Sequence, residues 1–499
     1  MSDVTDLATA QALIATQHQE LLRLQRENAS LRQQLDVLCQ RLFGKKSERV
    51  SPDQLRLAFA QLGHAPGAAS EPVEMDSGER PGPPRQRRRP TGRRPLPAAL
   101  PRQRVEIDVP DAAKRCPCGH LKSRIGESVS EKLEYVPASL RVIETARFKY
   151  ACPHCHAGVV EAPAPSQAVE KSLAGEGLLA HVVVSKYVDH LPLYRLERIL
   201  GRHGLDISRT TLCGWVADVA AALAPIGDEL RRQVTAATYL QTDDTPVTIL
   251  DQRLGSRKGR LWTYLDPLAR QVAFDATETH ERDGPEAFLA GFTGDLQADA
   301  YAGYDALYAT GRIREIACWA HTRRGFVEAL RTDARAAPMV ALIQRLYQVE
   351  RAGVDLSAEA RRALRLEQSV PILAQIKTAR DTLALAVLPK SPLGDAVRYL
   401  TNQWDALQRF VEAGRLAIDN NGAENQLRVV ALGRKNWLFA GSFDGAKRAA
   451  LLYSLVQSCT LADGPPFEYL RDVLLRVATH PQSQIAQLTP HGWAETFGQ

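Results

Sequence analysis

The sequence predicts a multidomain α+β protein, and three observations carry this prediction. A leucine-rich heptad repeat occupies the first 50 residues, two close cysteine pairs lie within residues 105–165, and the hydrophobic pattern changes from helical to strand periodicity near residue 236. At 499 residues the chain is too long for a single hydrophobic core, so several domains are expected.

The composition excludes several classes of protein. Hydrophobic residues make up 44% of the chain, enough for globular cores, and no apolar run approaches the roughly 20 residues of a membrane span. No basic stretch leads into an apolar one at the N-terminus, so we expect no secretory signal and predict a cytoplasmic protein. Eight cysteines, four of them in two tight pairs, favour metal binding over a disulfide framework in that compartment.

Residues 1–50 are expected to form a dimerising coiled coil. The heptad places Leu7, Ile14, Leu21, Asn28, Leu35 and Leu42 at a positions and Ala10, Gln17, Leu24, Leu31 and Leu38 at d positions. An asparagine at an a position fixes register and favours two strands, so a parallel homodimer is the first choice of oligomer. The alternative is an amphipathic helix packed on its own chain.

Residues 51–104 are expected to be an extended, basic linker. Between Arg80 and Arg104 there are nine arginines, seven prolines and no acidic residue, a composition that does not form a core. Such a tract suits a nucleic-acid backbone, and it also serves as a solubilising tether between domains.

Residues 105–165 predict a small zinc-binding module. The candidate ligands are Cys116, Cys118, Cys152 and Cys155, with His120 as an alternative to one member of the first pair. Four thiolates on two turns joined by a small hairpin provide the tetrahedral set that a structural Zn²⁺ requires. Only one residue separates the first two cysteines, whereas the second pair has the usual spacing.

Residues 166–235 read as a helical domain with a helix-turn-helix. A helix over 193–200 is followed by the glycine-containing turn Gly201–Gly204, and Ser208 can cap a second helix. Its first residues, Arg209, Thr210 and Thr211, are the candidates for contact with a DNA major groove. An antiparallel helical pair in an ordinary core gives the same pattern and is the alternative.

Residues 236–335 predict the first part of a catalytic core. Strands are expected at 239–247, 260–265, 271–274, 294–304 and 313–319, with helices at 285–292 and 323–330. Three antiparallel strands, a helix, then strand, helix and strand describe a ribonuclease H-like α/β sheet. A helical insertion over 336–415, the last helix of the core within 416–460 and a C-terminal tail over 461–499 complete the chain.

Three acidic residues of this core are the predicted catalytic and metal-binding site. Asp243 and Asp299 lie at neighbouring strand ends, and Glu424 lies in the first turns of a later helix. Carboxylate oxygens are the ligands that Mg²⁺ or Mn²⁺ prefers, and two such ions can promote displacement at a phosphodiester. Asp243 and Asp244 point to opposite faces of their strand, and either one is the first acid. The alternative for Glu424 is a helix-dipole acid paired with Arg428.

Basic and aromatic residues beside these acids suit a nucleic-acid strand. The candidates for DNA contact in the core are Arg323, Arg324, Arg434, Lys435 and Trp437. Surface arginines at a helix start are the alternative for the first two.

Four long motifs give the sequence a specific resemblance. They are Thr242-Asp-Asp-Thr-Pro, Leu296-Gln-Ala-Asp-Ala-Tyr-Ala-Gly-Tyr, Cys318-Trp-Ala-His-Thr-Arg-Arg, and Asn420-Asn-Gly-Ala-Glu-Asn followed by Arg434-Lys-Asn-Trp-Leu-Phe-Ala-Gly-Ser. With these motifs the chain resembles, over nearly its whole length, the large transposase of the insertion sequence sixty-six family. The resemblance implies that Asp243, Asp299 and Glu424 are the three catalytic acids. The sequence departs from the family where Asp244 replaces a glutamate and where the first cysteine pair is shortened.

The resemblance implies a DDE transposase. Such an enzyme binds double-stranded DNA at the terminal inverted repeats of its element, cleaves it with metal assistance and joins the ends to target DNA. It also implies a bacterial, DNA-associated protein whose accessory partners are encoded by the same element, and no membrane partner. Two other functions stay open: a DNA-binding regulator that has lost catalysis, and a nuclease of the same fold that cuts without joining.

Overall fold

The computed structural model describes residues 17–21, 23, 140–150, 160–170, 172–251 and 255–498. The chain divides into two compact units, one of Met1–Pro72 with Pro163–Gln499 and one of Val73–Ala162. In the second unit β1 (Lys149–Tyr150) pairs with β2 (Val160–Glu161) in an antiparallel hairpin.

Several predicted features lie wholly or mostly outside the described residues. Residues 17–21 and 23 are helical, as the heptad requires, while the rest of the predicted coiled coil, the basic linker and all the predicted zinc ligands lie outside. The coiled coil and the individual zinc ligands therefore stay predictions.

Three helices follow Pro163 in the larger unit: α3 (Glu176–Tyr187), α4 (Leu193–Arg202) and α5 (Arg209–Thr235). Ser208 caps α5 as predicted, since its hydroxyl accepts a hydrogen bond from Thr211 N at 3.2 Å. Gly204 has φ of +80°, a left-handed conformation that favours glycine, and it turns the chain between α4 and α5. The predicted helix, turn and helix are therefore present.

A five-stranded mixed sheet follows, in the spatial order β5-β4-β3-β6-β7. Its strands are β3 (Tyr239–Asp251), β4 (Gly255–Asp266), β5 (Gln271–Thr277), β6 (Gly294–Ala298) and β7 (Ile313–Ala317). β3, β4 and β5 pair antiparallel, whereas β6 pairs parallel with both β3 and β7. Short elements connect them: α6 (Asp283–Phe288), η2 (Ala302–Tyr304) and α7 (Asp305–Ala309). All five predicted strands are confirmed, although β6 is shorter than expected.

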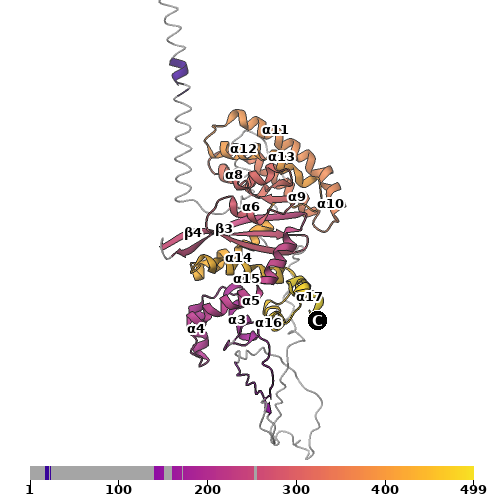
Figure 1. Ribbon diagram of the computed structural model, residues 1–499. Coiled ribbons are helices and arrows are strands. Elements are labelled where there is room, and N and C mark those ends of the chain that lie inside the picture. The colour runs from indigo at the N-terminus through magenta and orange to yellow at the C-terminus, as the bar shows by residue number, and fades with distance from the viewer. Residues whose placement is uncertain are drawn as a thin grey trace, which may run out of the picture. The chain divides into compact units, whose positions relative to one another are not determined.

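Two long helices pack against the sheet near its antiparallel half: α14 (Asn421–Trp437) and α15 (Phe443–Leu461). Figure 1 shows both helices on one side of the strands, with α8, α9 and α11 on the other. The edge strand β5 donates from Val272 N and Phe274 N to the hydroxyls of Ser458 and Ser454, at 2.9 Å and 2.7 Å. These serines satisfy edge groups that a bare strand would leave open to another chain.

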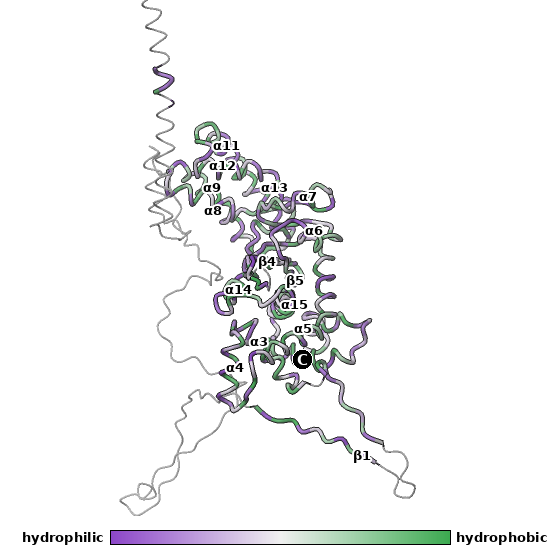
Figure 2. Tube along the Cα trace, turned by 60° about the vertical axis from the view of Figure 1, so that its left-hand side comes forward, coloured by the Kyte–Doolittle hydropathy of each residue, from purple (hydrophilic) through white to green (hydrophobic). Residues whose placement is uncertain are grey.

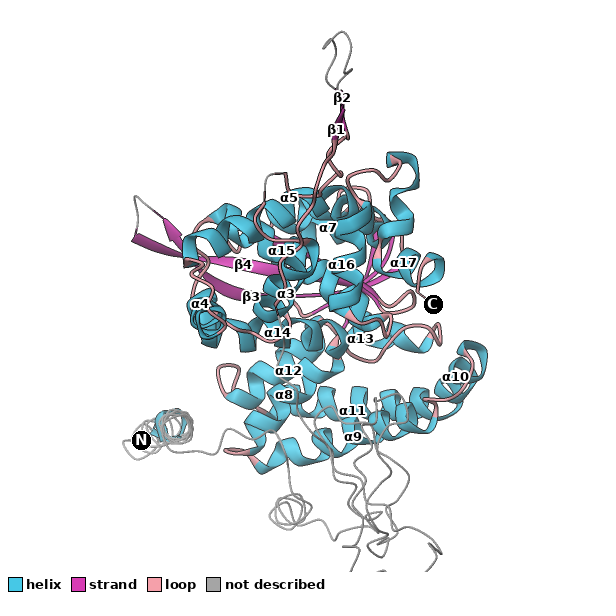
Figure 3. Cartoon of the chain, turned by 90° about the horizontal axis from the view of Figure 1, so that it is seen from below, coloured by secondary structure: helices cyan, strands magenta, loops and turns pink. Residues whose placement is uncertain are grey.

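A second hydrophobic core joins the helices between β7 and α14. They are α8 (Trp319–Leu330), η3 (Ala334–Ala336), α9 (Ala337–Ala352), α10 (Ala358–Leu364), η4 (Arg365–Ser369), α11 (Val370–Ala386), α12 (Pro392–Asn402), α13 (Trp404–Gln408) and η5 (Arg409–Val411). α9 and α11 lie side by side (Figure 3). The tube in Figure 2 alternates between apolar and polar residues along these helices, as helices with one buried face do.

The chain ends in α16 (Pro466–Arg476), η6 (Gln482–Leu488) and α17 (Pro490–Thr496). These elements belong to the first core, together with α3, α5 and much of the sheet.

Among the described helices, α5 is long and apolar enough to cross a membrane by length and composition alone. It buries Leu223, Ile226 and Leu230 completely in the first core. Burial inside the protein accounts for its apolar character, since buried core helices can have the same length and hydropathy as a membrane-spanning helix.

Candidate active site

Two predicted acids lie at corresponding positions on neighbouring strands. β3 and β6 run parallel with Gln241 opposite Gln297, and two residues farther along the chain reaches Asp243 and Asp299. Asp299 lies just past the end of β6, where its carboxylate accepts a hydrogen bond from Tyr301 N at 3.2 Å. The strand register therefore brings both acids to one part of the sheet.

The third acid, Glu424, reaches this region on the first turn of α14. Asn420 Nδ2 donates to Thr242 O at 3.2 Å and ties the start of the helix to β3. A Cβ atom on Gly422 would lie only 2.3 Å from Gln241 Oε1, so glycine permits this close approach. The predicted meeting of a strand and a later helix is thus present.

Electrostatic interaction confirms that the carboxylates are close neighbours. The pKa of Asp243 is raised to about 7, mainly by burial and also by the carboxylates of Glu424 and Asp299, while a hydrogen bond from Asp244 N opposes the shift. Burial also raises the pKa of Asp299, while His321 opposes that shift. Like charges that are removed from water favour the protonated form, so the cluster has a high affinity for positive charge.

Glu424 has cationic neighbours on α8 rather than on its own helix. Its Oε1 lies 3.6 Å from His321 Nε2 and its Oε2 lies 3.9 Å from Arg324 Nη2. No ion pair joins it to Arg428 in the described part of the chain, so the simple i,i+4 interpretation does not hold. Glu424 Oε1 is buried and has no hydrogen-bond partner there, which leaves an acceptor available.

The structure also distinguishes Asp243 from Asp244. Asp244 Oδ2 accepts from Arg260 Nη1 at 2.8 Å, and its Oδ1 lies 3.2 Å from His280 Nε2. Its charge is therefore balanced by Arg260, although its carboxylate also raises the pKa of Asp299, whereas Asp243 has Glu424 and Asp299 as neighbours. Sequence reasoning missed Arg260 and His280, because their pairing depends on the β3–β4 register and on a loop that folds back over it.

Asp419 is a further acid that sequence reasoning did not place in the site. It precedes α14 and accepts a hydrogen bond from the Tyr347 hydroxyl at 2.8 Å. Burial raises its pKa, and the Glu424 carboxylate adds to that shift. Its position immediately before the helix was the only signal available in the sequence.

The chemistry of the donor set fits a divalent cation. Within the described residues, no three His, Cys, Asp or Glu side chains are close enough to enclose a metal ion as they stand. Asp243, Asp299 and Glu424 nevertheless offer carboxylate oxygens, the preferred ligands of Mg²⁺, and Glu424 contributes an unpartnered one. These three residues could hold the ion, with Asp244 neutralised beside them.

The predicted DNA-contacting residues occupy different places. Arg209, Thr210 and Thr211 are exposed at the start of α5, and on α8 Arg324 is exposed and Arg323 is half-buried. On α14, Arg434 Nη1 donates to Thr245 Oγ1 at 2.7 Å and to Pro246 O at 2.5 Å, so it fastens the helix to β3. Lys435 is exposed and Trp437 is half-buried.

The raised pKa of Asp243 predicts a pH-dependent cost in stability. Its pKa is higher in the folded chain than the 3.8 of a fully solvated aspartate, so its stabilising contribution is present at low pH and is lost as pH rises toward about 7. In EDTA, Asp243→Asn should therefore be more stable than the native chain at pH 8. The advantage should grow by about 2–3 kcal/mol between pH 5 and pH 8, as urea unfolding would measure. A constant difference across that range would contradict a buried, titrating Asp243.

Four family models match this chain. The model described as "Transposase IS66 family" matches residues 171–448, a range that includes all three acids. Residues 113–156 match "zinc-finger binding domain of transposase IS66", residues 30–105 match "Transposase C of IS166 homeodomain", and residues 454–491 match "IS66 C-terminal element".

Curated relatives are similar over nearly the same length. An uncharacterized protein of Sinorhizobium fredii, y4hP, is 34% identical over 493 residues, which cover 93% of this chain and 88% of that protein. A second one from the same organism, y4jD, is 33% identical over 506 residues, which cover 96% and 98%. No solved structure matches the chain.

Proposed function

Because this chain belongs to the IS66 transposase family, we propose that it is a DDE transposase that binds the terminal inverted repeats of its element, cleaves the DNA strand and transfers it to target DNA. The observation that carries the proposal is the convergence of three separate segments on one carboxylate cluster. Asp243 lies on β3, Asp299 follows β6 and Glu424 lies on α14, and Asp243 interacts electrostatically with the other two. Asp243 and Asp299 are 56 residues apart in the sequence, and Asp299 and Glu424 are 125 apart.

The strand order supports a ribonuclease H-like assignment for the catalytic core. Three antiparallel strands continue into two parallel ones, and the acids come from the central strand, its parallel neighbour and a later helix. Active-site groups at strand ends are typical of mixed α/β sheets, where neighbouring strands present their side chains to one edge.

In the proposed mechanism Asp243, Asp299 and Glu424 would hold the divalent cations. Bound Mg²⁺ or Mn²⁺ would activate the attacking oxygen and stabilise the leaving oxygen of an in-line displacement at phosphorus. His321 and Arg324 flank Glu424 and keep its carboxylate oriented toward the cluster. Arg260 and His280 engage the two carboxylate oxygens of Asp244, which favours Asp243 as the first acid.

DNA recognition is proposed for the N-terminal domains and for the basic residues of the core. The zinc-finger domain would hold structural Zn²⁺ through Cys116, Cys118, Cys152 and Cys155, with His120 as the alternative ligand. Arg209, Thr210 and Thr211 are exposed at the start of a capped helix, as a major-groove helix requires. A homodimer through residues 1–50 would hold two element ends together. Accessory proteins encoded by the element would be further partners, and the protein would act in the cytoplasm of a bacterium.

A strand-transfer assay tests the proposed function. Incubation with Mg²⁺, a labelled duplex that ends in the element's terminal repeat and a target plasmid should give cleaved ends and covalent joint products. Each is an in-line displacement, so one cluster serves both steps. Cleavage without joining would indicate the nuclease, and metal-independent binding without cleavage would indicate the lapsed regulator.

A further inference from the structure

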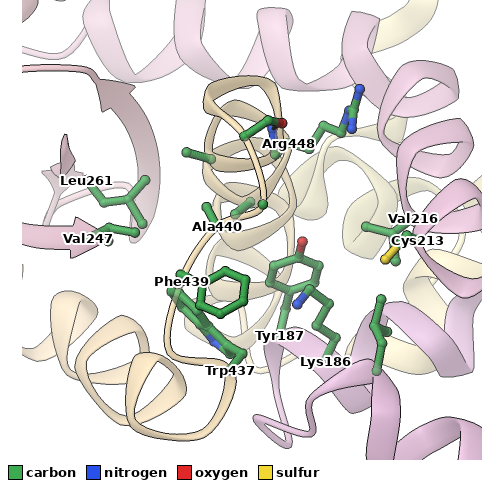
Figure 4. A pocket seen from close by; sticks show the side chains of 16 residues that line it. Lys186, Tyr187, Cys213, Val216, Val247, Leu261, Trp437, Phe439, Ala440 and Arg448 are labelled. Atoms are coloured by element: carbon green, nitrogen blue, oxygen red, sulfur yellow. Dashed lines mark hydrogen bonds between the residues drawn. The ribbon is translucent and has the colours of Figure 1, made fainter. Parts of the chain in front are cut away.

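A cavity of about 270 Å³ lies beside the sheet, apart from the three acids. It is lined by residues of α3, α4, α5, β3, β4, α14 and the start of α15, and by the loop that joins α14 to α15 (Figure 4). Val216, Val247 and Leu261 give it an apolar wall. The cavity is large enough for a flat aromatic ring system but shares no lining residue with the carboxylate cluster.

Two aromatic residues, Trp437 and Phe439, stand at the side of this cavity (Figure 4). Between them Leu438 has φ of +64°, an uncommon conformation for a residue with a Cβ atom, and it ends α14 sharply. Ala440 then binds β3 through its N–H to Thr248 O at 2.8 Å. The strained turn is thus fixed from one side by the sheet, and Phe439 is left 45% exposed.

Two cations, Lys186 and Arg448, also line the cavity. Lys186 Nζ lies 5.4 Å from the ring centre of Tyr187 and 5.8 Å from that of Trp437. Neither cation forms an ion pair with a carboxylate within the described residues. Unpaired positive charge at an apolar and aromatic cavity selects a ligand that has both an aromatic face and a negative charge.

The cavity lies a short distance along β3 from the acids at which the proposed DNA substrate would be cleaved. Asp243 and Val247 are four residues apart on β3, so their side chains share one face of the strand and lie about 13 Å apart along it. That distance equals about four steps of a DNA strand. α14 packs on β3 between these two points, where Arg434 contacts Thr245.

We propose that this cavity binds an unpaired nucleotide of the DNA substrate, with the base against Trp437 and Phe439 and a phosphate facing Lys186 and Arg448. The inference rests on the proposed function, because it takes DNA as the substrate. Stacking on an aromatic side chain accepts any base, so the site would hold an extruded nucleotide near the cleaved end without reading its identity.

The test uses Cys213, an exposed thiol that lines the cavity, as a reporter in the full-length native protein. Alkylation by iodoacetamide is followed by mass spectrometry of the peptide that contains it. A 12-mer of thymidine should slow alkylation of Cys213 about 10-fold, whereas a 12-mer of abasic sugar-phosphate should not, because only the first supplies bases for stacking. Lys186→Met should remove most of this protection, and the matched change Lys377→Met at an exposed site on α11 should not.

Fluorescence polarisation of the same two 12-mers, carrying a fluorescent label, separates the nucleotide-site hypothesis from the proposed transposase function. Binding of both without protection of Cys213 would overturn the nucleotide site and leave the proposed function intact. Equal protection by both would also overturn it, since phosphate alone would then occupy the cavity. Failure of the native chain to bind either 12-mer or the element-end duplex would count against the proposed function itself.

Discussion

Replacing Glu424 with glutamine is expected to lower Mg²⁺-dependent cleavage of an element end by about 10³-fold or more, while binding of the same DNA persists. Glutamine keeps the shape of the side chain but removes the charge that the proposed cations require. A loss of about 4 kcal/mol of transition-state stabilisation corresponds to that factor. Cleavage of a labelled duplex and a binding titration, both done with each protein, measure the two effects.

A second measurement and a matched variant make the Glu424 test specific. Mg²⁺ should raise the Tm of the native chain and should raise that of Glu424→Gln much less, because ligand binding to the folded state stabilises it. Glu328→Gln makes the same chemical change at an exposed position of α8 and should behave like the native chain. Equal cleavage by all three proteins would show that the third acid lies elsewhere.

Replacing Arg365 with methionine is expected to destabilise the chain by about 3–5 kcal/mol. Arg365 is only 1% exposed, and its guanidinium donates to both carboxylate oxygens of Glu350, at 2.8 Å and 2.6 Å. It also donates to Phe410 O, Ala413 O and Leu416 O at 2.7 Å, 3.0 Å and 2.9 Å. Methionine would leave a part-buried carboxylate and three carbonyls without their partner.

The consequence should appear as a fall in Tm of about 5–10 °C for the larger unit. Arg362→Met is the matched control. Arg362 is exposed, and among the described residues it donates only to Glu412 O, at 2.8 Å, so its loss should cost under about 0.5 kcal/mol. Similar Tm values for the two variants would mean that the hydrogen bonds of Arg365 do not stabilise the segment of residues 410–416. Since Ile418 O accepts from Trp319 N at 3.1 Å just beyond it, loosening the segment should also weaken the anchoring of α14.

Local sequence patterns determined much of this fold. The alternating strands, the change of period near residue 236 and the capping by Ser208 are short-range features, and the structure has each of them. The long motifs around Asp243, Asp299 and Glu424 indicated the family, and its models match the chain. Strand ends and helix starts are set by nearby residues, so the acidic residues at these positions can be found from the sequence.

The tertiary structure alone decided how those residues are paired. Asp244 is paired with Arg260 because the β3–β4 register brings these two side chains together, whereas Asp243 has Glu424 and Asp299 as charged neighbours. Glu424 lies near His321, more than 100 residues earlier in the chain, and Arg434, which is predicted to contact DNA, also fastens α14 to β3. Such contacts depend on strand register and helix packing between distant segments. Local periodicity does not encode either, because many registers bury the same apolar residues and only the complete core selects one.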